Sequence, residues 1–180
     1  MGSAVEKILG MNARNLLYIK PNNLRLAVRL ADDKLSHKKL LADNDYPVPK
    51  LYKEFKTPED VGEFDWISLP NSFVIKPAFG FGGEGIMVIF GKTKEGWIRT
   101  DGSIVDIDQM RIHSLDILDG SYSMHSLPDT AFIEQKVITH KVFKKYTYKG
   151  TPDIRIIVFN QVPVMAMLRV PTEESDGKAN

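Results

Sequence analysis

A lysine followed by a cluster of glycines is the part of this sequence whose residue types and spacing are best suited to chemistry. Lys76 ends the apolar run 73–75, and a second apolar run, 86–90, begins directly after the glycines Gly80, Gly82, Gly83 and Gly85. Clustered glycines let successive backbone N–H groups turn into one concavity, which suits a phosphate, and the lysine supplies a positive charge. The stretch predicts a phosphate-binding loop between two strands. The plainer alternative is a glycine-rich hairpin without a ligand.

The order of residues argues against the two commonest phosphate-binding loops. In the GxxxxGK[ST] loop the lysine follows the glycines, whereas Lys76 precedes them. Gly80, Gly82 and Gly85 match the spacing GxGxxG, but residues 86–90 have the pattern of a strand and not of the helix start that a dinucleotide-binding turn requires.

Composition limits the classes of protein. The chain has 180 residues, 43% of them hydrophobic, a net charge of +1 and no cysteine. The absence of cysteine excludes structural disulfides and thiolate metal sites, and the balanced charge gives no global basic field for nucleic acid or an anionic membrane. No apolar run approaches the length of about 18–20 residues that spans a membrane, and the N-terminal residues lack the pattern of a secretory signal. The sequence predicts a soluble, cytoplasmic protein with no nucleic-acid or membrane partner.

The elements that would position the loop are helices first and strands later, which predicts an α+β fold and not a doubly wound parallel sheet. Residues 4–31 have a helical pattern punctuated by Gly10 and Pro21, and Ser36 is the predicted cap of a helix over 37–43. Thr57 and Pro58 mark a short capped helix, and 106–119 fit a helix capped by Asp106 or Asp108. A linker is predicted near residue 70. Strands are predicted at 48–55, 73–76, 85–90, 96–99, 131–137, 153–159 and 162–170.

Four further segments align with the glycine stretch in order: "DDKLSHKKLLADNDYPVPKLY" (32–52), "FIEQKV" (132–137), "PDIRIIVFNQVPVMAMLRVPT" (152–172) and "SDGKAN" (175–180). Together they closely resemble ATP-grasp ligases, nearest to the alpha-L-glutamate ligase-like, or sugar-transfer-associated, ATP-grasp proteins. The resemblance implies an incomplete ATP-grasp fold. Its parts would be an N-terminal helical region (1–70), a glycine-loop nucleotide-binding subdomain (71–137) and the start of a C-terminal subdomain (138–180). It also implies ATP and Mg²⁺ as cofactors, with the metal ligands expected beyond Asn180.

The resemblance assigns roles to individual residues. Lys34 and Lys76 match lysines that approach the nucleotide phosphates, and Gly80–Gly85 matches the loop that closes over them. Glu134, Gln135, Lys136 and Val137 match the hinge whose main chain holds adenine. Arg155 and Arg169 match arginines that bind phosphates or the reaction intermediates. Each also has a plainer interpretation: Lys34 as a partner of Asp32 or Asp33, Glu134 as a strand-edge carboxylate, and the arginines as solvent-facing strand residues.

The pairing of the last two strands decides whether the two arginines share a face. A three-residue loop at 160–162 would pair Arg155 with Met167 and Asp153 with Arg169, and both arginines would then lie on one face. A two-residue loop at 160–161 would place them on opposite faces. We expect the first arrangement. Asp153 is then either a lone metal-ligand candidate or a structural partner of Arg169.

By resemblance, the chain would be an ATP-dependent carboxylate–amine ligase. ATP would phosphorylate a carboxylate, and an amine would attack the acyl phosphate; glutamate or a peptide are the candidate substrates. Because related chains continue past Asn180 into acidic strands, the sequence is interpreted as a fragment lacking full activity. The alternative is a non-catalytic nucleotide- or anion-binding module. A kinase is disfavoured, because the lysine precedes the loop and no HRD-like or DFG-like segment is present.

Overall fold

The computed structural model describes residues 9–80, 82–123 and 126–175, which form an α+β protein. Its strands are β1 (Leu51–Phe55), β2 (Phe73–Pro77), β3 (Met87–Lys92), β4 (Trp97–Arg99), β5 (Ile104–Val105), β6 (Ala131–Gln135), β7 (Asp153–Phe159) and β8 (Val162–Arg169). Its helices are α1 (Met11–Ala13), α2 (Lys20–Asn22), α3 (Arg25–Asp32), α4 (Lys34–Asp43), α5 (Pro58–Glu63) and α6 (Ile107–Leu118), with a π-helical segment η2 (Arg14–Ile19) and a 3-10 helix η3 (Trp66–Ser68). Apart from β5, each described strand lies within or beside a range that the sequence predicts.

Within the described residues, six strands form one sheet in the order β1-β6-β2-β3-β4-β5, and all neighbouring pairs are antiparallel. The strand β6 lies between β1 and β2, with Ile133 opposite Ile75 and Glu134 opposite Val74. The chain therefore brings together three segments that are far apart in the sequence. The predicted linker near residue 70 joins two strands of the same sheet, since β1 and β2 lie on either side of β6 and share one core.

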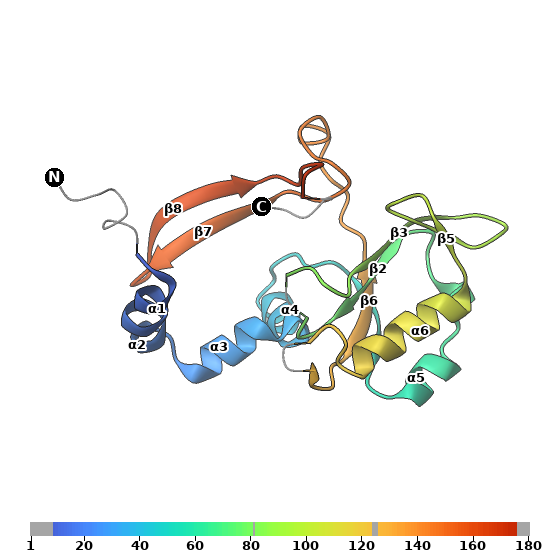
Figure 1. The fold of residues 1–180 in the computed structure, drawn as a ribbon, viewed down its shortest axis with the longest axis horizontal. Coiled ribbons are helices and arrows are strands. Elements are labelled where there is room, and N and C mark those ends of the chain that lie inside the picture. Colours follow the sequence, from blue (N-terminus) through green and yellow to red (C-terminus); the bar gives the residue numbers. More distant parts are fainter. Residues whose placement is uncertain (1–8, 81, 124–125, 176–180) are drawn as a thin grey trace.

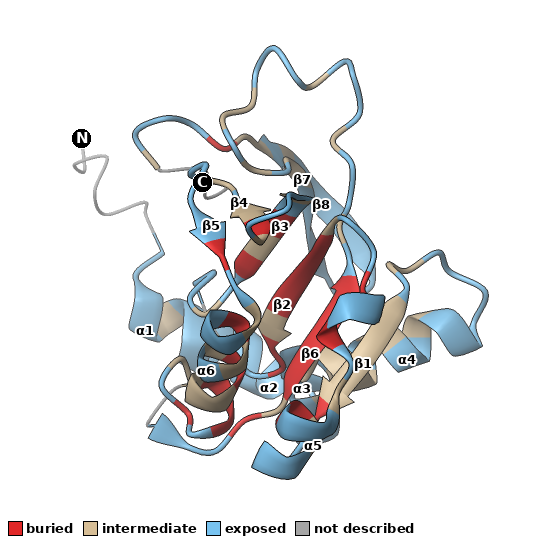
Figure 2. Cartoon of the chain, turned by 90° about the vertical axis from the view of Figure 1, so that its right-hand side faces the viewer, coloured by how far each residue is buried: buried red, intermediate tan, exposed pale blue. Residues whose placement is uncertain are grey.

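One face of the sheet carries the hydrophobic core and is covered by α5 and α6 (Figure 2). Five strand residues are fully buried, Phe55, Phe73, Ile75, Ile89 and Ile133, as are the side chains that cover them, Trp66, Met110 and Ile117. Alternation along each strand sends every second residue to the opposite face. The core thus fixes which strand residues face the other way.

Capping boxes start the two helices that cover this core. Thr57 caps α5, where its hydroxyl accepts from the Asp60 N–H, and the Asp60 carboxylate accepts in return from the Thr57 N–H. Asp106 caps α6 by the same exchange with Gln109. Both helix starts confirm the sequence prediction, and for α6 they decide in favour of Asp106 over Asp108.

The helix α4 begins earlier than predicted. Its cap is Asp33 and not Ser36, because the Asp33 carboxylate accepts from the N–H groups of Leu35 and Ser36. Ser36 lies inside the helix and donates its hydroxyl to the same carboxylate. An aspartate that satisfies two free N–H groups outcompetes a serine placed one turn later. The prediction of Ser36 as the cap was wrong.

The strands β7 and β8 form a separate two-stranded hairpin, drawn in orange-red in Figure 1, away from the larger sheet. Its turn is the two-residue Asn160–Gln161, both with positive φ, and a bulge lies between Ile157 and Val158. The bulge restores the pairing predicted from the longer loop: Arg155 lies opposite Met167 and Asp153 opposite Arg169. The register prediction is confirmed, although the loop on which it rested is one residue shorter.

In the part of the chain that the structure describes, no helix is both long and apolar enough to cross a lipid bilayer.

Candidate nucleotide-binding site

The sheet face opposite the core carries the charged residues. On β2 and β6, Val74, Lys76, Phe132 and Glu134 alternate with core residues, and Val74 is paired with Glu134 while Lys76 is paired with Phe132. Lys76 and Glu134 are therefore diagonal neighbours on adjacent strands, a spacing that long side chains span. The register of β2 and β6 brings together a lysine and a glutamate that are far apart in the sequence.

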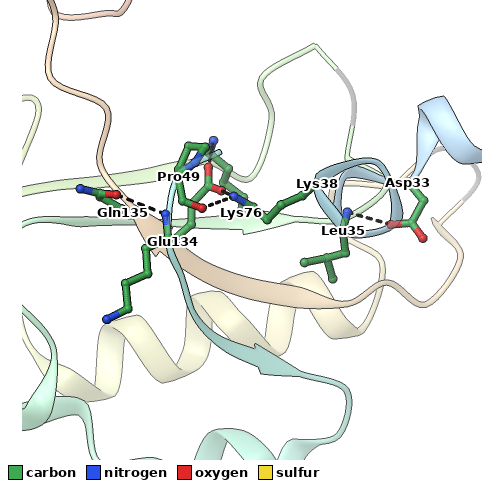
Figure 3. Close-up of polar contacts among 8 residues, drawn as sticks. Asp33, Leu35, Lys38, Pro49, Lys76, Glu134 and Gln135 are labelled. Carbon is green, nitrogen blue, oxygen red and sulfur yellow. Dashed lines mark hydrogen bonds and ion pairs between the residues drawn. The ribbon is translucent and has the colours of Figure 1, made fainter. Parts of the chain in front are cut away.

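The Glu134 carboxylate is held between two lysines (Figure 3). Lys76 Nζ contacts Glu134 Oε1, and Lys38 Nζ lies 2.8 Å from Glu134 Oε2. The Glu134 side chain is 6% exposed and that of Lys38 12%, whereas that of Lys76 is 27% exposed. A carboxylate this buried needs its cations nearby. Lys76 is the more accessible of the two cations and the better placed to meet a ligand.

Lys38 was not among the residues predicted from the sequence. It lies on α4 one helical turn after Lys34, and its ammonium also donates to the Pro49 carbonyl, which immobilises it at the edge of the sheet. The i, i+4 spacing of Lys34 and Lys38 places both on one helix face, and that spacing is the signal that could have found it.

Lys34 holds the start of the glycine loop, defined as Gly80–Gly85. Its ammonium donates to the carbonyls of Ala78 at 3.1 Å and Gly80 at 2.5 Å, and its N–H donates to Ala78 at 3.2 Å. Burial lowers the pKa of Lys34 and repulsion from Lys76 lowers it further, whereas the Asp129 carboxylate opposes both effects. Lys34 therefore lies close enough to Lys76 and to Asp129 for both charges to act on its pKa.

Asp129 anchors the same end of the loop. It is buried, and its carboxylate oxygens accept from the Phe79 N–H at 3.1 and 3.0 Å and from the Thr130 N–H at 2.6 Å. The Ala78 N–H donates to the Thr130 carbonyl at 2.9 Å, which ties the end of β2 to the start of β6. Asp129 is a second residue that the sequence prediction missed.

The loop glycines differ in what surrounds them. Gly82 and Gly83 have positive φ, and a Cβ added at either would meet no atom within 4 Å. Gly80 and Gly85 are packed instead, against the rings of Pro77 and Tyr122. Phe81 lies outside the described residues. The loop therefore combines two packed end glycines with two open inner ones, whose left-handed backbone other residues adopt only at a cost.

An open groove of about 570 Å³ runs between α4 and β1. Lys38 and Lys50 line it, and it extends to Ala78 and Phe79, the two residues that precede the glycine loop. The groove shares Lys38 with the Glu134 contacts and Ala78 with the Lys34 contacts. Among the described residues, Lys38 lines the groove, whereas Lys34, Lys76 and Glu134 do not, so the groove lies beside the lysine cluster and does not contain it.

The residues of the predicted hinge, 134–137, differ in whether their peptide groups are hydrogen-bonded. Gln135 is engaged by Lys50: its N–H donates to the Lys50 carbonyl at 2.8 Å, and its side-chain oxygen accepts from the Lys50 N–H at 3.2 Å. Lys136 and Val137 follow the end of β6, and their peptide groups make no backbone hydrogen bond to another described residue. The Lys136 ammonium lies 4.3 Å from the centroid of the Phe90 ring.

The two predicted catalytic arginines lie on one face of the β7–β8 hairpin and not within the lysine cluster. Arg169 Nε donates to Asp153 Oδ1 at 2.7 Å, and its Nη2 contacts the other carboxylate oxygen. Arg155 is exposed on the same face. Asp153 is thus the structural partner of Arg169 that the sequence offered as an alternative to a metal ligand, and the bidentate contact lowers the pKa of Asp153.

A family model, sugar-transfer associated ATP-grasp, matches residues 13–180. The chain belongs to the sugar-transfer associated ATP-grasp family. This match covers nearly the whole chain and confirms the resemblance drawn from the lysine, glycine-loop and hinge segments. No curated protein and no solved structure gives a match. ATP-grasp proteins in general bind ATP and catalyse ATP-dependent ligation, so the family accounts for a basic cluster beside a glycine loop.

The magnesium ion that the family implies finds no site among the residues described here. Across 9–80, 82–123 and 126–175, no group of three histidine, aspartate or glutamate side chains is placed to hold a metal. The acidic residues nearest the lysines, Glu134 and Asp129, are already occupied by ammonium and N–H groups. We therefore assign no metal ligand.

Proposed function

We propose that this chain provides the nucleotide-binding part of an ATP-dependent carboxylate–amine ligase that acts through an acyl phosphate. The observation that carries the proposal is the placement of three lysines from α4 and β2 beside the glycine loop. Lys34 donates to the carbonyl of Gly80 at the start of the loop, and Lys38 and Lys76 hold Glu134 on the adjoining sheet face. Such an arrangement supplies both charge and backbone donors to a polyphosphate.

Lys76 is the cation we assign to the phosphates. Of the two lysine side chains that contact Glu134, that of Lys76 is the more exposed. An incoming phosphate can therefore replace the Glu134 carboxylate as the partner of Lys76. Lys38 then keeps Glu134 neutralised at its second oxygen, which avoids a buried unpaired charge. Glu134 remains near the hinge, where the open peptide groups of Lys136 and Val137 are suited to an adenine edge.

The glycine loop would lie over the phosphates and exclude water from the acyl phosphate, which water would otherwise hydrolyse. Arg155 and Arg169 would stabilise the phosphates or the intermediates from the β7–β8 hairpin. Mg²⁺, when bound with ATP, supplies positive charge at the phosphate oxygens. The carboxylate and amine substrates, glutamate or a peptide by resemblance, have no residue assigned to them.

The test is calorimetric titration of Mg-ATP into the chain and into Lys76→Ala. We expect the substitution to weaken binding by at least about tenfold, as the loss of a charge-assisted contact to phosphate implies. Lys94→Ala is the matched control: Lys94 is an exposed lysine between β3 and β4, and it does not line the groove. Equal binding by Lys76→Ala and the control would refute the role of Lys76.

Turnover is a separate question from binding. Release of ADP in the presence of amino-acid or peptide acceptors would support a ligase. ATP binding without ADP release from any acceptor would favour the alternative of a non-catalytic nucleotide-binding module.

A further inference from the structure

The far end of the glycine loop is held by a histidine that the proposed function does not use. His113 on α6 places its Nε2 atom 3.0 Å from the carbonyl oxygen of Gly85. Gly85 has φ +71°, and a Cβ at this position would lie 2.6 Å from Cγ of the Tyr122 ring. The last glycine of the loop is therefore fixed by a hydrogen bond and by a close approach that a larger residue would not permit.

The chemistry of the contacts defines the state of the imidazole. A carbonyl oxygen can only accept, so His113 Nε2 must carry the proton, and in the neutral ring Nδ1 is then an acceptor. The Tyr122 hydroxyl lies 3.4 Å from this Nδ1 atom and is placed to donate to it. The two rings pack with centroids 5.4 Å apart. Hydroxyl, imidazole and carbonyl thus form one chain of contacts from Tyr122 to the loop.

We propose that His113, supported by Tyr122, is a positioning residue that fixes the end of the glycine loop and thereby sets where the loop amides meet the nucleotide phosphates. The inference rests on the proposed function for its last step. The two ends of the loop are then held by different devices: Lys34 and Asp129 hold the start, and His113 holds the end. The core residue Met110 anchors α6 to the sheet, and His113 lies on the same helix. The contact of His113 with Gly85 therefore holds the end of the loop in a fixed place relative to the core.

Fixing both ends matters because Gly82 and Gly83 are exposed, and a Cβ added at either would meet no described atom within 4 Å. Their N–H groups can meet a phosphate at a defined distance from Lys76 only if the flanking backbone is held. Preorganised donors bind more tightly than donors that must be ordered first. His113 thus acts on affinity without touching the ligand.

The first experiment measures the loop without nucleotide. We would record ¹⁵N relaxation of the Gly82, Gly83 and Gly85 amides in the wild-type chain, in His113→Gln, which retains a side-chain N–H donor, and in His113→Leu. Lower order parameters are expected in His113→Leu, with recovery toward wild type in His113→Gln. His37→Leu, the same change at an exposed histidine on α4, is the control and should leave the loop unchanged. Unchanged order parameters in His113→Leu would overturn the proposal.

A second measurement needs no substitution. Imidazole ¹⁵N shifts of the wild-type chain should show His113 as the neutral tautomer protonated at Nε2. The opposite tautomer cannot donate to Gly85 and would contradict the proposal even if His113→Leu fails to fold.

The third measurement connects the loop to the nucleotide. Leaving the Gly85 carbonyl without its donor is expected to weaken Mg-ATP binding by about five- to tenfold in His113→Leu, with most of the affinity restored in His113→Gln. A loosened loop with unchanged affinity would refute the positioning role. If the wild-type chain binds no Mg-ATP, the proposed function fails, while the relaxation data still decide whether His113 holds the loop.

Discussion

Replacing Lys38 with methionine tests the buried charge arrangement most directly. Lys38→Met keeps an unbranched apolar side chain on α4 but removes one of the two ammonium groups that contact Glu134. Glu134 Oε2 then loses its partner at 2.8 Å, and the carboxylate depends on Lys76 alone. The Pro49 carbonyl loses a donor as well.

The burial of the three side chains sets the expected size. Breaking a fully buried ion pair costs about 3–5 kcal/mol, because a charge is left without compensation. Here Glu134 is 6% exposed, but the remaining cation, Lys76, is 27% exposed and stays in place, so water and Lys76 compensate part of the loss. We expect Lys38→Met to lower the free energy of unfolding by about 2–3 kcal/mol.

Urea denaturation gives this value, and Lys39→Met is the matched control. Lys39 and its partner Asp43 are 77% and 58% exposed, and a surface pair of this kind contributes about 0.3–0.5 kcal/mol. In the double variant Lys38→Met with Glu134→Gln, the buried charge is gone, and the cost of removing Lys38 should fall well below its value in the wild-type background. Two results would contradict this inference. One is an equally small loss of unfolding free energy in Lys38→Met and Lys39→Met. The other is a double variant whose loss equals the sum of the losses in Lys38→Met and Glu134→Gln.

Three further predictions follow from single contacts. Gly85→Ala should destabilise the chain by about 1–3 kcal/mol in urea, because Cβ would meet the Tyr122 ring at positive φ, while Gly82→Ala, in open space, should cost about 1 kcal/mol. Asp153→Asn should change the stability by less than about 1 kcal/mol, since the pair with Arg169 is partly exposed; a larger loss in urea would contradict this. Burial lowers the pKa of His113, helped by Arg99 and opposed by the Gly85 carbonyl and Asp116. Its contribution to stability is therefore present above the unfolded pKa of about 6.5 and is lost as pH falls through the lower folded pKa. The wild-type chain should lose more stability than His113→Gln over this range, and equal losses would count against the prediction.

The sequence predicts the strands well because they are short runs rich in apolar and β-branched residues, and the period of two then assigns each residue to a face. Phe73, Ile75 and Ile133 fall on the core face, and Lys76 and Glu134 on the other, as a period of two requires. The residue pattern within one strand does not predict which strand, far away in the sequence, it pairs with. The contact between Lys76 and Glu134 exists because β6 inserts between β1 and β2, and no local pattern encodes that order.

The errors and omissions have a common physical origin in competition between polar groups. Ser36 is a good cap in isolation, but Asp33 reaches the same N–H groups first. Lys38 and Asp129 resemble ordinary surface residues in the sequence, and they become important only because the fold gives Lys38 a buried carboxylate and Asp129 partly buried backbone N–H groups as partners. Their roles are tertiary, so composition and spacing could not rank them above their neighbours.

Charge balance explains why the site described here needs more than its own lysines to hold a triphosphate. The positive charges of Lys34, Lys38 and Lys76 are opposed by the buried carboxylates of Glu134 and Asp129 and, at Lys34, by Asp33 and Asp32 as well, so these lysines leave no surplus of positive charge near the loop. On the hairpin, Asp153 neutralises Arg169, so that Arg155 is the cation without a bidentate partner there. A triphosphate carries several negative charges, and backbone amides offset them only in part. Nucleotide affinity should therefore depend strongly on the cation that accompanies ATP: chelation of Mg²⁺ during calorimetric titration should weaken binding by more than the loss of any single lysine. Equal affinity with and without the metal would mean that the lysines and loop amides balance the phosphates by themselves.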